Sequence, residues 1–268
     1  MGHPYFAVAT PTVIGHRGAA GEAPENTLPS FERALAAGAA ILESDVHLTR
    51  DAVPVLLHDD VVERTTDGRG RVAELTLAEL QALDAGYHFS PDGGRTHPFR
   101  SRGVRVPTLA QALAAFPGAR FNLELKDGGA GLVRAVLDVI EQTGSAARTL
   151  LTAGDDGLMT LLREEVARRG ADVALGASAR EVGDFLRSAL ARKPPPAGPM
   201  ALQVPPDFAG QPLVTRDFVA HAHAHGLVVH VGTIDEPEEM RALLALGVDG
   251  IVTDFPARLA ALIRARRG

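Results

Sequence analysis

Cysteine and tryptophan are both absent from this sequence of 268 residues, and aromatic residues make up only 4% of it. The absence of cysteine excludes a disulfide framework and a metal site built from thiolates. The scarcity of aromatic side chains argues against the stacking surfaces that bind single-stranded nucleic acid. A metal ion in this protein must therefore be held by oxygen atoms or by histidine nitrogens.

An excess of positive charge is missing as well, because 27 lysines and arginines stand against 33 aspartates and glutamates, for a net charge of -6. Proteins that hold nucleic acid through its phosphates need a basic surface. We expect no nucleic-acid partner, and we expect a small anionic substrate to be bound by a few local cationic groups.

Long apolar runs are also lacking, and no stretch approaches the roughly 18 residues of a transmembrane helix. Residues 1–18 lack the basic start and the apolar middle of a secretory signal peptide. We therefore expect a cytoplasmic protein without a transmembrane segment. A transient contact with a membrane surface is compatible with this sequence, which gives no sign of its oligomeric state.

The composition that remains, 46% hydrophobic and 22% charged, is typical of one large globular domain. Short β-branched runs alternate with alanine- and leucine-rich segments of helical period. Strands are predicted at 12–15, 41–47, 121–125, 149–152, 173–175, 201–204, 227–231 and 250–252, and helices among others at 28–37, 107–116, 131–142 and 256–266. This alternation predicts an α/β fold with a parallel sheet and outer helices, and about eight units predict a (β/α)8 TIM barrel.

The rival fold is an open, doubly wound sheet. It would have a glycine-rich phosphate loop after the first strand, and neither G-x-G-x-x-G nor a P-loop motif occurs. Residues 60–106 interrupt the alternation and are rich in Gly, Arg, Asp and Pro. We interpret them as an inserted subdomain or long loop within a single domain at 10–268. The short run at 54–57 either extends the strand at 41–47 or pairs with it.

Barrel enzymes carry their catalytic groups at the carboxyl ends of the strands. Here the first predicted strand ends in His16 and Arg17, and the second carries Glu43, Asp45 and His47 at alternating positions. A period of two places these last three side chains on one face of the strand. Five polar residues therefore fall where a barrel enzyme would use them.

The following apolar runs continue this arrangement. His58 follows the run at 54–57, and the third barrel strand carries Glu124 and Lys126 on one face. Buried carboxylates need a compensating charge. Since Glu43, Asp45 and Glu124 would converge from neighbouring strands, they predict a metal site. An all-oxygen set favours one hard divalent cation, Mg²⁺ or Ca²⁺, over zinc.

The remaining groups fit the cleavage of a phosphodiester. His16 and His58 titrate near neutral pH, so one can accept a proton from the nucleophile while the other donates one to the leaving alkoxide. Arg17 and Lys126 can neutralise phosphate oxygens. Taken singly, Lys126 also fits an ion pair with Glu124 inside the barrel, and Arg17 fits a cap on a neighbouring carboxylate.

Two other groups are weaker candidates. His221 and His225 have the spacing of zinc ligands on a helix, but no glutamate lies between them, and histidines at a helix C-terminus are favoured by the helix dipole. Asp254 ends the last strand and fits either the rim of the site or the cap of the next helix.

The order and spacing of several short motifs closely resemble the glycerophosphodiester phosphodiesterase family over about 13–256. These motifs are His16-Arg17-Gly18, Pro24-Glu25-Asn26-Thr27, Glu43-Ser44-Asp45-Val46, His58-Asp59, Arg64-Thr65-Thr66 with Gly68, the run FNLELK at 121–126 and the run GVDGIVTD at 247–254. The resemblance implies a (β/α)8 barrel with a small insertion after the second strand, and hydrolysis of glycerophosphodiesters to an alcohol and glycerol 3-phosphate.

The resemblance also implies roles for individual residues. It assigns the divalent metal to Glu43, Asp45 and Glu124, acid–base catalysis to His16 and His58, and assistance at the phosphate to Arg17 and Lys126. Some members of the family proceed through a cyclic phosphate formed by the substrate's own neighbouring hydroxyl.

One departure from the family concerns the seventh strand, which ends in Gly232-Thr233-Ile234-Asp235 where the family commonly has Trp-Thr-Val-Asn. A glycine in place of an aromatic wall either admits a bulkier alcohol or a lipid chain, or leaves room that another residue fills. Hydrolysis of lysophospholipids, in the manner of a lysophospholipase D, is therefore the alternative function. A non-catalytic phosphodiester-binding barrel and an amidohydrolase, which would need His-x-His on the first strand, are weaker alternatives.

Overall fold

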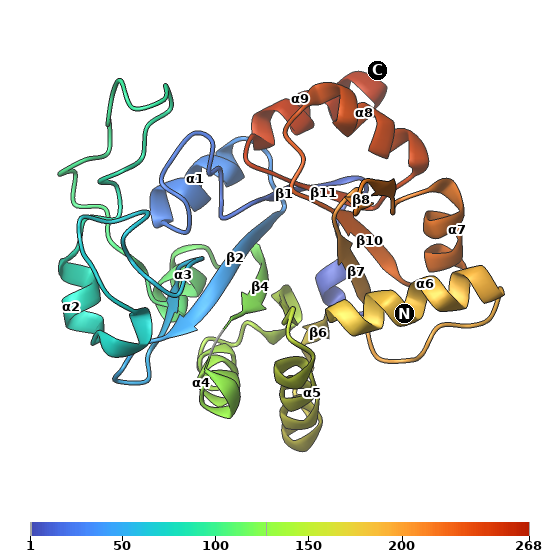
Figure 1. The fold of residues 1–268 in the computed structure, drawn as a ribbon, viewed down its shortest axis with the longest axis horizontal. Coiled ribbons are helices and arrows are strands. Elements are labelled where there is room, and N and C mark those ends of the chain that lie inside the picture. Colours follow the sequence, from blue (N-terminus) through green and yellow to red (C-terminus); the bar gives the residue numbers. More distant parts are fainter. Residues whose placement is uncertain (1, 127, 268) are drawn as a thin grey trace.

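A computed structural model of the protein describes residues 2–126 and 128–267. Within these residues, eight parallel strands form a nearly closed barrel in the order β6-β5-β4-β2-β1-β11-β10-β7 (Figure 1). The strands are β1 (Thr12–Gly15), β2 (Ile41–Leu48), β4 (Arg120–Leu125), β5 (Thr149–Thr152), β6 (Ala174–Leu175), β7 (Ala201–Val204), β10 (Val228–Val231) and β11 (Gly250–Thr253). A single parallel bridge, from Gly176 to Ala201, joins β6 to β7. The predicted barrel is confirmed, and the open sheet is wrong because the first strand pairs with the last.

Helices cover the outside of this barrel. They are α1 (Leu28–Ala36), α3 (Leu109–Ala115), α4 (Gly129–Gln142), α5 (Asp156–Arg169), α6 (Ala179–Ala191), α7 (Arg216–Ala224), α8 (Pro237–Leu246) and α9 (Pro256–Arg267). Helix α4 buries Leu132, Val133, Val136, Leu137 and Ile140, whose spacing is that of one helical face. The apolar stripe therefore explains why this segment packs as a helix against the barrel.

The start of α3 differs from the prediction, which placed a proline at the first helical position. The helix begins at Leu109, because the side chain of Thr108 accepts a hydrogen bond from the backbone N–H of Gln111, whose own side chain accepts one from the backbone of Thr108. This capping box satisfies two backbone donors that a helix start leaves free. Pro107 therefore precedes the helix.

Alternation along the strands separates an outer apolar face from an inner polar one. On β4, Phe121, Leu123 and Leu125 pack into the main hydrophobic cluster beneath the helices, whereas Asn122 and Glu124 line a cavity inside the barrel. A period of two produces this division on every strand that faces helices on one side and the barrel axis on the other. The polar residues near the carboxyl ends of the strands are consequently held inside.

The amino-terminal residues close the opposite end of the barrel. Tyr5, in the short 3-10 helix η1 (Pro4–Phe6), is fully buried in a cluster with Ile14, Ile41 and Val252. The barrel core therefore begins before residue 10, the predicted start of the domain. Its predicted end, Gly268, lies outside the described residues.

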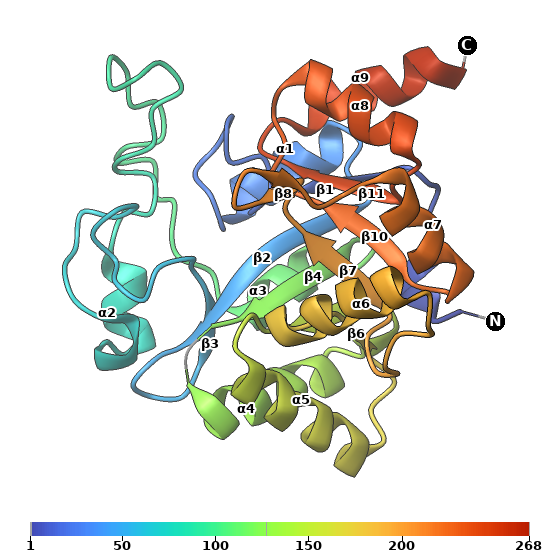
Figure 2. The ribbon, with the colours of Figure 1, turned by 45° about the vertical axis from the view of Figure 1, so that its right-hand side comes forward.

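The insertion follows β2. Strand β3 (Pro54–Leu56) turns back and pairs antiparallel with β2, after which come η2 (Val72–Glu74) and α2 (Leu77–Ala82). Figures 1 and 2 show α2 and the loops around it on one side of the barrel. A separate apolar cluster holds this region together, formed by Val55, Leu57, Val62, Val72, Leu80, Ala85, Val104 and Val106.

A small hairpin, β8 (Asp207–Phe208) and β9 (Gln211–Pro212), follows β7 at the carboxyl end of the barrel. Its turn contains Ala209 and Gly210, both at positive φ. This hairpin and the first turns of α6 border the same end of the barrel as the polar strand ends. In the described part of the chain, no helix is long and apolar enough to cross a membrane.

Candidate active site

His16 lies directly beyond β1 and beside the end of β11. Because Gly15 and Thr253 are partners in the β1–β11 register, the next residues of both strands are neighbours, and His16 Nδ1 lies 2.7 Å from Asp254 Oδ1. Burial of the ring disfavours its charged form, but the hydrogen bond to Asp254 and the charge of Glu43 outweigh this and raise the pKa of His16. Asp235 accepts a hydrogen bond from the backbone N–H of Asp254 and holds that carboxylate in place.

His58 has a similar carboxylate partner. Its Nδ1 lies 2.6 Å from Asp59 Oδ1. His47 is buried beneath it, with Nε2 3.0 Å from the backbone carbonyl of His58. Since carboxylates and carbonyls only accept hydrogen bonds, Nδ1 of His58 and Nε2 of His47 carry the protons. Nε2 of His58 is then the nitrogen left for proton transfer.

Arg64, from the insertion, connects the two histidine-bearing loops. Its guanidinium donates to both oxygens of Glu25 at 2.6 and 2.8 Å and to Asp59 Oδ2 at 2.6 Å. Glu25 also accepts a hydrogen bond from Arg17 Nη1 at 2.9 Å. The hydrogen bonds from Arg64 lower the pKa of Asp59 to about 2, so this carboxylate stays charged beside His58.

The Arg64→Ala variant is expected to lower kcat roughly tenfold, with a smaller change in KM, because Asp59 and Glu25 would lose the partner that orients them. The measurement is steady-state turnover of bis(p-nitrophenyl) phosphate. Arg71→Ala is a matched control, since Arg71 is similarly exposed in the insertion and pairs with Asp60. An unchanged kcat in Arg64→Ala would show that this arginine does not position the histidine loops.

Asp45 and Glu124 are register partners on β2 and β4, and a lysine bridges them. Lys126 Nζ lies 2.9 Å from Asp45 Oδ1 and 2.7 Å from Glu124 Oε2. Burial disfavours the charged form of Lys126, but these two carboxylates outweigh it and raise the pKa. Asp45 also accepts a hydrogen bond from Asn26 Nδ2 at 3.1 Å and lies 3.3 Å from Arg17 Nε.

Glu43 is a carboxylate placed close to a second one, Asp45. Its Oε2 accepts a hydrogen bond from the backbone N–H of Arg17 at 3.0 Å, but burial and the nearby charge of Asp45 raise its pKa to about 7. A divalent cation beside Glu43 would relieve both effects. The donor set of three carboxylates therefore fits a hard cation chemically.

The positions of these carboxylates fit a metal ion less well than their chemical type does. Among the described residues, no three Asp, Glu or His side chains are grouped closely enough to hold a metal ion. The ammonium of Lys126 lies between Asp45 and Glu124, so a cation bound by all three carboxylates would compete with it. The metal ligands remain a prediction. The ion pairs that the sequence allowed as alternative roles are present too. Lys126 pairs with Glu124, and Arg17 pairs with Asp45 and Glu25.

Glu124 lines two hollows. The larger, of about 550 Å³, is lined by His16, Glu43 and Glu124 and continues into the barrel and toward α6. The smaller, of about 350 Å³, is lined by His58, Lys126 and Glu124. Glu124 thus borders both the hollow that contains His16 and Glu43 and the hollow that contains His58.

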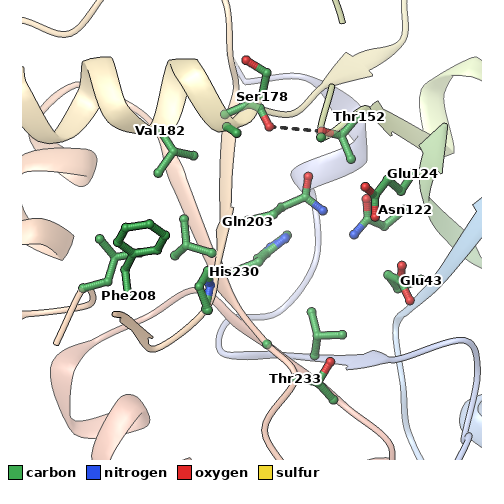
Figure 3. A pocket seen from close by; sticks show the side chains of 18 of the residues that line it. Glu43, Asn122, Glu124, Thr152, Ser178, Val182, Gln203, Phe208, His230 and Thr233 are labelled. Carbon is green, nitrogen blue, oxygen red and sulfur yellow. Dashed lines mark hydrogen bonds between the residues drawn. The ribbon is translucent and has the colours of Figure 1, made fainter. Parts of the chain in front are cut away.

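The floor of the larger cavity contains polar residues for which the sequence predicted no role in the site. Asn122, Gln203 and His230 point into it from β4, β7 and β10 (Figure 3). Burial lowers the pKa of His230 to about 4, so its ring is neutral at pH 7. The available signal was the inward phase of the alternation: Gln203 and His230 are single polar residues in otherwise apolar strands, and Asn122 lies two positions before Glu124.

Position 232 does not provide the free space that its sequence suggested. A Cβ atom added to Gly232 would lie 2.4 Å from Cβ of Val252, so with this backbone any larger residue would displace Val252. Gly232 and Thr233 line the larger cavity. The absence of a side chain at Gly232 lets the chain pass close to Val252, so it leaves no empty space there.

The histidines of α7 have other partners. His221 Nε2 lies 3.2 Å from Ser188 Oγ, and its ring packs against that of His225. His223 pairs with Asp249 at 2.8 Å. No group of three potential metal ligands exists there within residues 2–126 and 128–267.

Comparison with known proteins identifies the protein family. The model of the Glycerophosphoryl diester phosphodiesterase family matches residues 16–130 and 177–258. The chain belongs to this family. It is 30% identical over 260 residues to a glycerophosphodiester phosphodiesterase of Caldanaerobacter subterraneus, covering 94% of this chain and 97% of the relative. The protein is accordingly an enzyme with glycerophosphodiester phosphodiesterase activity.

Solved structures of similar proteins agree with this assignment. A Silicibacter pomeroyi protein, described as a candidate glycerophosphoryl diester phosphodiesterase, has a TM-score of 0.79 and 29% identity over 99% of each chain. A phosphodiesterase of Oleispira antarctica, solved with its product sn-glycerol-3-phosphate, has a TM-score of 0.76 and 27% identity, covering 95% of this chain and 97% of that one. The resemblance stated from the sequence motifs is therefore confirmed.

Proposed function

We propose that the enzyme hydrolyses glycerophosphodiesters to an alcohol and glycerol 3-phosphate, with His16 and His58 as the acid–base pair. The observation that carries the proposal is the pairing of each histidine with a carboxylate, His16 with Asp254 at 2.7 Å and His58 with Asp59 at 2.6 Å. Each pair fixes the proton on Nδ1 and leaves Nε2 for the substrate. His16 lines the larger hollow and His58 the smaller one, and Glu124 lines both.

Glu43, Asp45 and Glu124 would hold one divalent cation, Mg²⁺ or Ca²⁺, which when bound would neutralise phosphate charge and polarise the phosphorus centre. Arg17 and Lys126 are the cationic side chains nearest these carboxylates, and in this proposal they contact the non-bridging phosphate oxygens. One histidine accepts a proton from the nucleophile, and the other donates a proton to the leaving alcohol.

The direct test is product analysis with glycerophosphocholine as substrate. We expect choline and glycerol 3-phosphate in equal amounts, because the bond from phosphorus to the choline oxygen breaks. The product sn-glycerol-3-phosphate in the Oleispira antarctica relative supports this outcome. Release of phosphocholine and free glycerol would contradict the proposal, since the other phosphoester bond would then have been cleaved.

An acyl chain on the glycerol would leave this chemistry unchanged, so lysophospholipids are the alternative substrates. A barrel that only binds phosphodiesters is disfavoured, because His16, His58 and the three carboxylates are all present at the carboxyl end of the strands.

A further inference from the structure

Three polar side chains at the floor of the larger cavity have no role in the chemistry proposed above. Oδ1 of Asn122, Oε1 of Gln203 and Nδ1 of His230 are buried atoms without a hydrogen-bond partner among the residues that the structure describes. Buried polar atoms in proteins are usually hydrogen-bonded, because an unpaired one has lost its contact with water. We call these three residues the polar floor. It is suited to a ligand that supplies the missing hydrogen bonds.

The barrel brings the polar floor together and leaves room for it. Gln203 and His230 are register partners on β7 and β10, and Asn122 comes from β4. Figure 3 shows all three side chains directed into the cavity. A Cβ atom at Gly176 would lie 2.5 Å from Oε1 of Gln203, and one at Gly250 would lie 2.9 Å from Cδ2 of His230. Any larger residue at these two positions would therefore displace the amide or the imidazole.

The polar floor suits hydroxyl groups better than a cation. Amides and a neutral imidazole can both accept and donate hydrogen bonds, as a hydroxyl group does. Burial lowers the pKa of His230 to about 4, and the charge of Asp249 offsets this only in part, so the floor does not stabilise positive charge. Aromatic rings would favour a quaternary ammonium group, but Phe208, which is 72% exposed, is the only phenylalanine or tyrosine that lines the cavity in the described part of the chain.

The size of the cavity indicates which part of a glycerophosphodiester reaches the floor. Its volume is about 550 Å³, whereas the hollow beside His58 has about 350 Å³. The glycerol half of the substrate is always small, but a polyol headgroup can be longer or cyclic and then carries more hydroxyl groups. The larger hollow, with its three unpaired polar groups, matches the headgroup better than the glycerol.

We propose that the polar floor binds the hydroxyl groups of an uncharged polyol headgroup, so that glycerophosphodiesters with such a headgroup are better substrates than those with a cationic one. Gln203 and His230 are then specificity-determining residues. The inference rests on the proposed function, because it takes the phosphate to lie beside Glu43 and Glu124 with the headgroup in the larger cavity. The bond that breaks is still the one from phosphorus to the headgroup oxygen, with water supplying the hydroxyl group to phosphorus and a proton to the leaving polyol.

The test compares glycerophosphoinositol and glycerophosphoglycerol with glycerophosphocholine and glycerophosphoethanolamine. Each substrate releases glycerol 3-phosphate, so an assay coupled to glycerol-3-phosphate dehydrogenase gives kcat/KM on one scale. The wild-type enzyme is expected to favour the polyol substrates roughly tenfold, because their hydroxyl groups pair with polar atoms that a cationic headgroup leaves unpaired. Gln203→Leu and His230→Leu should each lower the ratio of kcat/KM for glycerophosphoinositol to that for glycerophosphocholine by roughly three- to tenfold.

Thermal unfolding separates a binding role of these residues from a structural one. Both substitutions replace an unpaired buried polar group with an apolar group of similar size, so neither should lower Tm. A lower Tm in both variants would show that the two side chains are already paired within the protein, and would overturn the inference.

Gln142→Leu is the matched control, because Gln142 is an exposed glutamine at the end of α4 that does not line the cavity. It should keep the wild-type preference. Equal kcat/KM for all the substrates in the wild-type enzyme would overturn the inference and leave the proposed function intact, and so would a preference that survives both substitutions. An equal loss with every substrate would also overturn it, because the floor would then contact the glycerol that they share. Failure to hydrolyse any of them would instead contradict the proposed function, on which the inference rests.

Discussion

Replacing His16 or His58 by alanine is expected to lower kcat by roughly 10²–10⁴-fold with the fold intact. Each substitution removes one member of the proposed acid–base pair, and no other histidine with a carboxylate partner lines either hollow among the described residues. His230 also lines the larger cavity, but burial lowers its pKa to about 4, so at neutral pH its ring lacks the acidic imidazolium proton. It is therefore a poor substitute for either ring.

The partners of the two histidines should show an intermediate effect. Asp254→Asn keeps the shape of the side chain but removes the charge that stabilises a protonated His16. We therefore expect its kcat to lie between that of the wild type and that of His16→Ala.

His225→Ala is a suitable control for the two histidine variants, since His225 is an exposed histidine at the end of α7. Turnover near the wild-type rate in either His16→Ala or His58→Ala, measured with glycerophosphocholine, would refute the acid–base roles.

Removal of divalent cations is the second large effect that we expect. EDTA should reduce turnover by roughly 10²-fold or more, and Mg²⁺ or Ca²⁺ should restore it, because a bound cation contributes several kcal/mol of charge stabilisation at the phosphate. The reason lies in the carboxylates. Without a cation, burial and Asp45 together raise the pKa of Glu43 to about 7, and Lys126 is engaged by Asp45 and Glu124. Turnover that EDTA does not change would refute the metal assignment.

Thermal unfolding provides a readout of the cation that is independent of activity. A cation at about 100 times its Kd should raise Tm by about 5 °C, because binding to the native state alone adds about 2.7 kcal/mol. Glu43→Gln should remove this shift, whereas Glu141→Gln, which changes an exposed glutamate on α4, should retain it. An equal shift in both variants would show that Glu43 is not a ligand.

Local periodicity explains why so much of the barrel could be predicted. The predicted strands at 173–175 and 227–231 are observed as Ala174–Leu175 and Val228–Val231, because strands buried in a parallel barrel consist of short β-branched runs. The same periodicity of two placed Glu43, Asp45 and Glu124 on inward faces. These features depend on neighbours a few residues apart along the chain, and a sequence displays such neighbours directly.

The sequence by itself thus determined the barrel and the side of each strand that is polar, and it predicted the reacting groups. The tertiary structure alone decided which of these groups meet. Asp254 reaches His16 across 238 positions because the barrel closes between β1 and β11, and Arg64 reaches Glu25 because the insertion folds back over the first loop. Such contacts follow from closure of the barrel and from packing between distant segments, which no local pattern of residues encodes.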